Sequence, residues 1–181
     1  MRTITTAALA ALALAGCAKN ADIGTPLAGG RTATAALRTS AGASVGHATA
    51  AEVAGGVRFT ADVTGLPPGT HGIHVHTVGA CDAPDFTTAG PHWNPSGGKH
   101  GFNNPAGPHR GDLPNVTVAA NGVLHEAVSL AGASVASLLD ADGAALVLHA
   151  APDDYATDPS GNSGDRIACA VITSVVVPAG G

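Results

Sequence analysis

The stretch from Gly72 to Asp112 reads GIHVHTVGACDAPDFTTAGPHWNPSGGKHGFNNPAGPHRGD, and the rest of the fold has to accommodate it. It holds five of the nine histidines of the chain and ends in an aspartate. Imidazole nitrogens bind copper and zinc, and a carboxylate can complete a zinc site. The stretch therefore predicts a metal centre, whose candidate ligands are His74, His76, His92, His100, His109, Asp112 and, farther along the chain, His149.

An alternating segment carries the first two histidines. Successive side chains of a strand point to opposite faces, so Ile73 and Val75 face one side while His74 and His76 face the other. Both imidazoles are then available to one ion. Residues 77–112 have little periodicity and many Gly, Pro and Asn residues. An irregular loop of this length within a compact domain is usually functional.

The candidate ligands divide into two sets of different chemistry. One set offers three imidazoles and one carboxylate, which is a closed, four-coordinate arrangement typical of structural zinc: His92, His100, His109 and Asp112. The other set offers three further imidazoles, from His74, His76 and His149. Three or four nitrogens in a flattened arrangement favour copper, which is redox active. The remaining histidines have simpler interpretations. His47 and His125 are expected to be ordinary polar residues, and His71 to be structural or to orient a ligand.

The rest of the chain predicts an all-β fold. Short segments of strand character are separated by Gly, Pro, Asn and Asp turns, and no segment shows helical periodicity. Seven or eight such strands indicate an antiparallel sandwich or barrel, with two long functional loops at 77–112 and 150–165. The expected strands span 31–39, 44–53, 57–63, 71–76, 115–119, 123–130, 144–148 and 166–177.

Composition limits the function classes. The 181 residues suffice for one domain with a core, and because aromatic residues make up only 3%, Val, Leu, Ile and Ala must build that core. The net charge of −5, with no Lys/Arg cluster, argues against a nucleic-acid partner.

The N-terminal segment predicts export. Residues 1–16 resemble a secretory signal, and Leu14 to Cys17 reads LAGC, like the sequence at which bacterial lipoproteins are lipidated on cysteine. The alternative is an ordinary signal peptide with a chance cysteine. Residues 17–30 then form a lipidated tether and 31–178 the folded domain. If Cys17 carries lipid, Cys81 and Cys169 remain as a pair, or as two free thiols.

Six motifs together resemble the copper/zinc superoxide dismutases, in particular exported bacterial lipoproteins of that family. The motifs are GIHVH, AGPHWNP, KHG, PHRGDLPNV, VLHA and GDRIACAVI, and the match extends over about residues 31–177. The resemblance implies an eight-stranded Greek-key β-barrel. It also implies dismutation of superoxide to oxygen and hydrogen peroxide, with Cu and Zn as cofactors.

The resemblance further assigns roles to single residues. His92 would bridge the metals, completing a copper set with His74, His76 and His149 and a zinc set with His100, His109 and Asp112. Asp153 would link a copper ligand to a zinc ligand, Arg166 would guide the anion, and Cys81 and Cys169 would form a disulfide. The 150–165 loop has no lysine, and Asp165 adjoins Arg166, so electrostatic guidance is expected to be weak.

Several alternatives stay open at this point. The main one is a copper-binding or copper-buffering lipoprotein without turnover, and others are a copper-only enzyme and a purely structural sandwich. The expected partners are superoxide and a membrane contacted only through the N-terminal lipid, on the periplasmic or cell-surface side. A homodimer is also considered, and an exposed apolar patch would be needed to argue for it.

Overall fold

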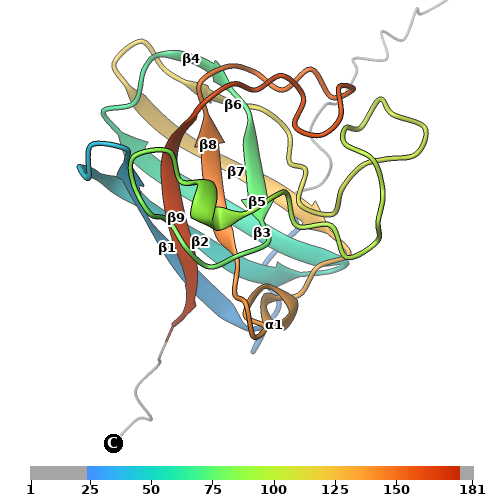
Figure 1. Ribbon diagram of the computed structural model, residues 1–181. Helices are drawn as coiled ribbons and strands as arrows, with labels where there is room; N and C mark the ends of the chain where they lie inside the picture. The colour runs from blue at the N-terminus through green and yellow to red at the C-terminus, as the bar shows by residue number, and fades with distance from the viewer. Residues whose placement is uncertain (1–23, 176–181) are drawn as a thin grey trace, which may run out of the picture.

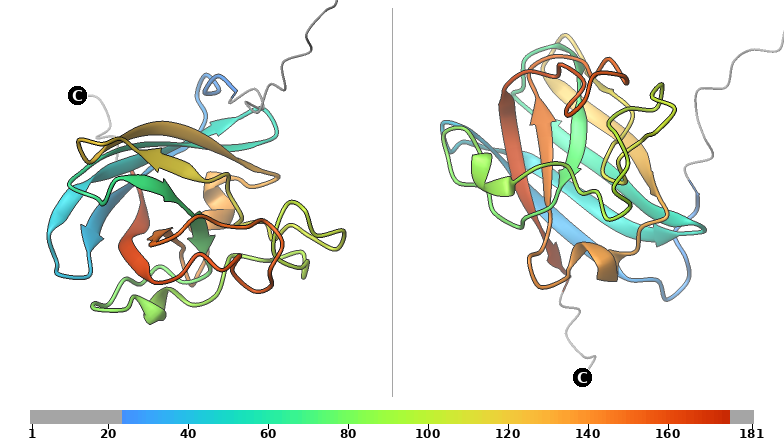
Figure 2. Two further views of the ribbon diagram at one scale, coloured as in Figure 1. Left: turned by 90° about the horizontal axis from the view of Figure 1, so that it is seen from above. Right: turned by 45° about the vertical axis from the view of Figure 1, so that its right-hand side comes forward.

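The computed structural model describes residues 24–175, which form a curled antiparallel sheet with two long loops on one side (Figures 1 and 2). The strands are β1 (Thr32–Thr39), β2 (Ser44–Val53), β3 (Gly56–Thr64), β4 (Gly69–His71), β5 (Ile73–His76), β6 (Val116–Val118), β7 (Val123–Ala131), β8 (Ala145–His149) and β9 (Arg166–Ser174). The predicted signal segment and Cys17 lie outside the described residues. No helix in the described part of the chain is long and apolar enough to cross a membrane.

The strands are connected as in a Greek-key barrel. Seven of them form one sheet in the order β5-β8-β9-β1-β2-β3-β7, and β4 and β6 form a small second sheet. Because β4 leads directly into β5 and β6 turns into β7, the small sheet spans the opening between the two edges of the large one. The expected all-β, antiparallel architecture is therefore confirmed.

The strand predicted over residues 71–76 is divided in two. Gly72 donates its amide to Ala151 O (2.9 Å), and its carbonyl accepts from His149 N (2.9 Å). The chain thus changes partners at Gly72, so β4 pairs with β6 and β5 pairs with β8. This division gives nine strand segments where eight were expected.

Two short helical segments were not predicted, the 3₁₀ turn η1 (Thr87–Ala89) and the α-helical turn α1 (Val135–Leu138), and each is too short to produce a helical period in the sequence. The caps of α1 explain why it forms. Ser134 and Ser137 form a reciprocal capping box, and a carboxylate oxygen of Glu52 on β2 accepts from Val135 N (3.2 Å). Local capping therefore forms this turn where periodicity gave no signal.

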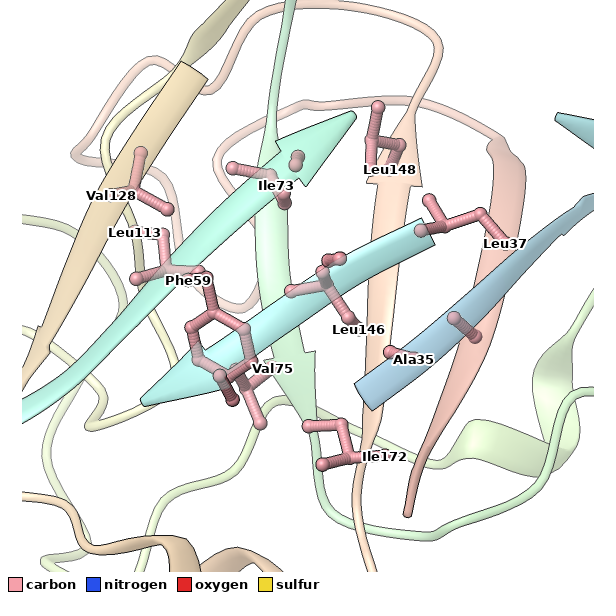
Figure 3. Close-up of a cluster of buried hydrophobic side chains, with 14 of the residues drawn as sticks. Ala35, Leu37, Phe59, Ile73, Val75, Leu113, Val128, Leu146, Leu148 and Ile172 are labelled. Carbon is pink, nitrogen blue, oxygen red and sulfur yellow. The ribbon is translucent and has the colours of Figure 1, made fainter. Parts of the chain in front are cut away.

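The core is aliphatic, as the composition predicted. Leu37, Phe59, Ile73, Leu146 and Leu148 are fully buried and belong to one cluster between the two halves of the curled sheet (Figure 3). A smaller cluster lies beneath the loop that follows β5. There Phe86, Ala89, Ala145 and Val147 surround the disulfide between Cys81 and Cys169, which confirms that predicted pair. The disulfide attaches this loop to β9.

Candidate metal centre

Two neighbouring strands carry the first imidazole cluster. His74 and His76 lie on β5, on the face opposite the core residues Ile73 and Val75, and His149 ends the adjacent strand β8. All three imidazoles are buried beneath the loops. Together with His92 they form a group of four whose ligand atoms lie within 4.8 Å of one another.

Backbone carbonyls fix the tautomers of two of these rings. Nδ1 of His76 donates to Gly90 O (2.8 Å), and Nδ1 of His149 donates to Gly164 O (3.1 Å). Each Nε2 is then left with its lone pair facing the cluster. Four buried ring nitrogens have no hydrogen-bond partner among the described residues: Nδ1 of His74 and Nε2 of His76, His92 and His149. Orphaned buried nitrogens that face one another form a donor set suited to a copper ion.

The carboxylate of Asp112 organises the second cluster. Its Oδ1 lies 2.9 Å from Nδ1 of His92, 3.1 Å from Nδ1 of His100 and 3.4 Å from Nδ1 of His109. Ligands about 2.0 Å from a tetrahedral zinc ion are about 3.3 Å apart, so these four atoms fit that geometry. The other oxygen, Oδ2, accepts from the backbone amides of Gly101 (2.8 Å) and His109 (3.0 Å), which hold the carboxylate in place.

One imidazole belongs to both clusters. Nδ1 of His92 faces Asp112, while its Nε2 is one of the unpartnered nitrogens of the first cluster. The two groups of candidate ligands therefore adjoin through a single ring.

A second link between the clusters comes from the 150–165 loop. Oδ2 of Asp153 lies 2.9 Å from Nε2 of His74, and its Oδ1 lies 2.9 Å from Nε2 of His100. Each ring thus directs Nδ1 toward its own cluster, since Nε2 donates to the carboxylate. Gly161, at φ +64°, lies against this pair, and a Cβ there would overlap the Asp153 carboxylate. The loop can cover the carboxylate so closely only because this residue is glycine.

The free edge of β5 positions the long loop. His74 and His76 form isolated bridges with Asp112 and His92 respectively, and Val75 N donates to Gly111 O (2.9 Å). A Cβ on Gly111 would overlap Val75 O, so only glycine permits this approach. Backbone pairing at one strand edge therefore gathers ligands from distant parts of the chain.

Arg166 lies beside the first cluster. Its Nη1 donates to Phe86 O (2.6 Å) and its Nη2 to Gly90 O (2.9 Å), which hold the half-buried guanidinium in place. His76, His92, His149 and Arg166 line one cavity of about 440 Å³. An anion in this cavity would meet a fixed positive charge next to the imidazole nitrogens.

The carboxylate that acts on Arg166 differs from the one expected from sequence. The charge of Asp85, in the loop after β5, opposes the lowering of the Arg166 pKa that burial causes. The neighbour in sequence, Asp165, lines the adjoining surface hollow together with Asp85 and Arg166. Both aspartates thus lie near the guanidinium. Asp85 could not be predicted there, because spacing in the sequence does not show where its loop folds.

Burial sets the protonation of the imidazoles. Burial, and then the charge of neighbouring histidines, lowers the pKa of His76 to about 2 and of His149 to about 3. Burial also lowers the pKa of His92 to about 4, although the hydrogen bond that its ring donates to Asp112 acts in the opposite direction. In His100 burial is outweighed by the hydrogen bonds to Asp112 and Asp153, which raise its pKa to about 9. His76, His92 and His149 therefore offer neutral nitrogens at neutral pH, as metal binding requires.

All the predicted ligands are thus brought together, while the other histidines lie elsewhere. His71 is buried, with its ring nitrogens 2.8 Å from His149 O and 2.9 Å from Pro67 O. His47 and His125 are exposed on the sheet. Sequence analysis missed Asp158, whose Oδ1 accepts from His100 N (2.9 Å) and whose Oδ2 lies 3.0 Å from Lys99 Nζ. No local pattern distinguishes this aspartate from its neighbours in the loop.

The fold and the two adjoining clusters define a class, namely antiparallel β-barrel metalloproteins with two neighbouring ion sites. A family model described as copper/zinc superoxide dismutase (SODC) matches residues 44–172. The chain belongs to the copper/zinc superoxide dismutase family.

Individual relatives agree with this assignment. The chain is 42% identical over 137 residues to superoxide dismutase (Cu-Zn) 1 of Aquifex aeolicus, covering 72% of this chain and 81% of that protein. It is 42% identical over 148 residues to superoxide dismutase (Cu-Zn) of Caulobacter vibrioides, covering 78% and 85%. Among solved structures, a SOD-like protein from Bacillus subtilis has a TM-score of 0.74 at 38% identity, covering 76% and 97%. The Cu/Zn superoxide dismutase from Brucella abortus has a TM-score of 0.65 at 28% identity, covering 77% and 98%.

Proposed function

We propose that this protein converts two superoxide anions and two protons into oxygen and hydrogen peroxide, with copper and zinc as cofactors. The observation that carries the proposal is the position of His92, whose two ring nitrogens face two different donor sets beside a cavity that also contains Arg166. Family membership and the names of the relatives support the same reaction.

The donor atoms suggest which residues hold each ion. We assign copper to Nδ1 of His74 and Nε2 of His76, His92 and His149, since these buried nitrogens otherwise lack partners. We assign zinc to Asp112 and to Nδ1 of His92, His100 and His109, whose separations fit a tetrahedral site. Copper supplies one-electron redox chemistry when bound, whereas zinc has no redox chemistry of its own.

The chain itself binds the substrate and handles protons. Arg166 attracts superoxide to the cavity and orients it, because the Phe86 and Gly90 carbonyls fix the guanidinium there. Peroxide formation consumes protons, and Nε2 of His92 can hold one beside the bound anion while Nδ1 remains with the zinc set. Asp153 keeps His74 and His100 in the tautomers that ligation needs.

The main rival function is copper buffering without turnover. Storage would need neither a shared imidazole nor an arginine fixed beside the cluster, so His92 and Arg166 favour the enzyme. One purified sample tests this when its copper and zinc contents are measured together with superoxide consumption. We expect both metals and catalytic turnover. Copper bound without turnover would indicate the buffering protein, and full activity without zinc would indicate a copper-only enzyme.

The location of the protein is also a proposal. The LAGC sequence at Leu14 to Cys17 supports export and lipid attachment at Cys17, with residues 17–30 as tether and 31–178 as the catalytic domain. The attached lipid would hold the domain at a membrane surface, on the periplasmic or cell-surface side. The homodimer stays a prediction, since the exposed large apolar side chains of the described residues, Leu27, Phe102, Val123 and Val175, come from different segments.

A further inference from the structure

Two histidines take no part in the buried centre, and both lie beside the same carboxylate. Six of the nine histidines line the two clusters, and His71 is buried against backbone carbonyls. The other two, His47 on β2 and His125 on β7, are exposed. Between β2 and β7 runs β3, which carries Asp62.

Strand register places these three residues in one row. His47 is the direct partner of Asp62, and Asp62 is the direct partner of His125. Directly opposed residues of neighbouring strands project from the same face of a sheet. That face is the outer one. The residue next to the row on each of the three strands points the other way and is buried in the core, namely Ala48, Ala61 and Leu124. The row is therefore His-Asp-His on the open surface of the barrel.

This surface is separate from the buried centre. The half of the sheet formed by β1, β2, β3 and β7 lies on one side of the molecule, and the loops 77–112 and 150–165 lie on the other (Figure 2, left). The outward residues of the next row are the small Thr49, Thr60 and Ala127, so an ion and its waters have room above the row.

The spacing of the row suits one ion. Neighbouring strands are about 4.8 Å apart, so His47 and His125 are about 10 Å apart at their backbones, and each ring has to span about 5 Å sideways. A histidine side chain and a metal–nitrogen bond of about 2 Å together cover that distance. Asp62 lies beneath the midpoint and already contacts Nδ1 of His125. The ligand atoms of the row are not yet gathered like those of the buried clusters, so binding requires the exposed His47 ring to turn toward Asp62.

We propose that His47, Asp62 and His125 form a third metal site, which binds one divalent transition-metal ion at the protein surface. Two imidazoles and one carboxylate favour such ions over magnesium or calcium, and among them Cu²⁺ binds nitrogen donors most tightly. The net charge of −5 favours the approach of a cation. The row thus gives the protein a solvent-accessible copper site besides its two buried ones.

Equilibrium dialysis of the fully metallated protein against buffered, low-micromolar Cu²⁺ tests the proposal, with copper and zinc both measured afterwards. We expect the wild type to bind one more equivalent of copper than the double variant His47→Ala/His125→Ala. Asp62→Asn should weaken this extra binding by about 10-fold or more, because the carboxylate is one of three donors. Thr60→Ala, two residues from Asp62 on the same strand and face, should bind like the wild type.

The control measurements separate this site from the buried centre. Buried copper and zinc and superoxide consumption should be unchanged in the double variant, because the row contributes no ligand to either cluster. The third site is disproved if the wild type binds no more copper than the double variant, or if Thr60→Ala loses the extra equivalent as well. Neither result depends on the protein being a dismutase, since dialysis measures binding alone.

Discussion

Nδ1 of His92 lies 2.9 Å from Oδ1 of Asp112, and Nε2 of the same ring has no hydrogen-bond partner among the described residues, so the ring lies between a carboxylate and a cluster of unpartnered imidazole nitrogens. The backbone maintains this position, since His92 bridges to His76 and Asp112 bridges to His74 along the free edge of β5. The His92 imidazole is thus positioned by backbone β-pairing as well as by its hydrogen bond to Asp112. The following predictions test residues arranged around it.

Arg166→Ala should retain both metals and lose about 10- to 100-fold in kcat/KM. A guanidinium about 5 Å from a bound anion, at an effective dielectric of about 20, contributes roughly 3 kcal/mol, and solvent in the open cavity reduces that figure. Pulse-generated superoxide decay, followed alongside elemental analysis, gives both quantities. Because the chain carries a net charge of −5, the wild-type rate should fall only slightly with salt, and the variant should lose or reverse that slope. If kcat/KM falls steeply as salt rises, and still does so in Arg166→Ala, residues other than Arg166 guide superoxide to the cavity.

Asp85→Asn should raise kcat/KM at low ionic strength and leave the metal content unchanged. Asp85 is the carboxylate whose charge acts on Arg166, so its removal strengthens the positive potential at the cavity. Asn keeps an oxygen that can accept from Thr87 N, as Oδ1 of Asp85 does (3.1 Å). The gain should disappear at high salt, and an equal gain at all salt concentrations would contradict an electrostatic cause.

Asp153→Asn should weaken retention of copper and zinc by about 10- to 100-fold, because His74 and His100 lose the carboxylate that orients both rings. Competition with a chelator, read by elemental analysis, measures the loss. Asp154→Asn is the matched control. Asp154 is exposed and bonds only within its own loop, to Ala156, Thr157 and Asn162, so that variant should keep both metals. Equal losses in the two variants would mean that the loop as a whole, rather than Asp153, is responsible.

The metal-free protein should become less stable as the pH falls from about 7 to about 4. His76, His92 and His149 have folded-state pKa values of about 2, 4 and 3, below the ordinary value of 6.5, so below pH 6.5 the unfolded chain binds protons that the folded chain does not. The pKa of His100 is raised to about 9, so its stabilising contribution is complete below pH 6.5 and is lost only as the pH rises through 9.

Denaturant unfolding, followed by the fluorescence of the single tryptophan, Trp93, measures this dependence. Adding copper and zinc should raise the free energy of unfolding most near neutral pH, where the ligands are deprotonated. A free energy of unfolding that rises as the metal-free protein is acidified from pH 6.5 to 5 would contradict the lowered pKa values.

Cys17→Ser should release the protein from the membrane fraction without changing its metal content or specific activity. Stable anchoring needs more than one acyl chain, and Cys17 is the proposed attachment point. Fractionation, with mass spectrometry of the N-terminal peptide, measures the change. A Ser variant that still carries lipid and stays with membranes would rule out this attachment.

The sequence by itself determined the residue types and the local geometry of the centre. Alternation placed His74 and His76 on one face of a strand, turn residues separated the strands, and the few aromatic residues required an aliphatic core. These features follow from backbone periodicity and composition, which act within a few residues, so they were predictable. The family motifs added the partners of His92, of Asp153 and of the two cysteines.

Only the tertiary structure decided what meets across the chain. Spacing in the sequence gives no sign that the carbonyls of Phe86 and Gly90 hold Arg166. It also gives no sign that Asp158 accepts a hydrogen bond from His100 N in the 77–112 loop. The division of β4 from β5 at Gly72 likewise follows from hydrogen bonds to Ala151 and His149, far along the chain. Backbone groups are chemically alike in every residue, so which of them meet is determined by strand register and loop packing over the whole barrel.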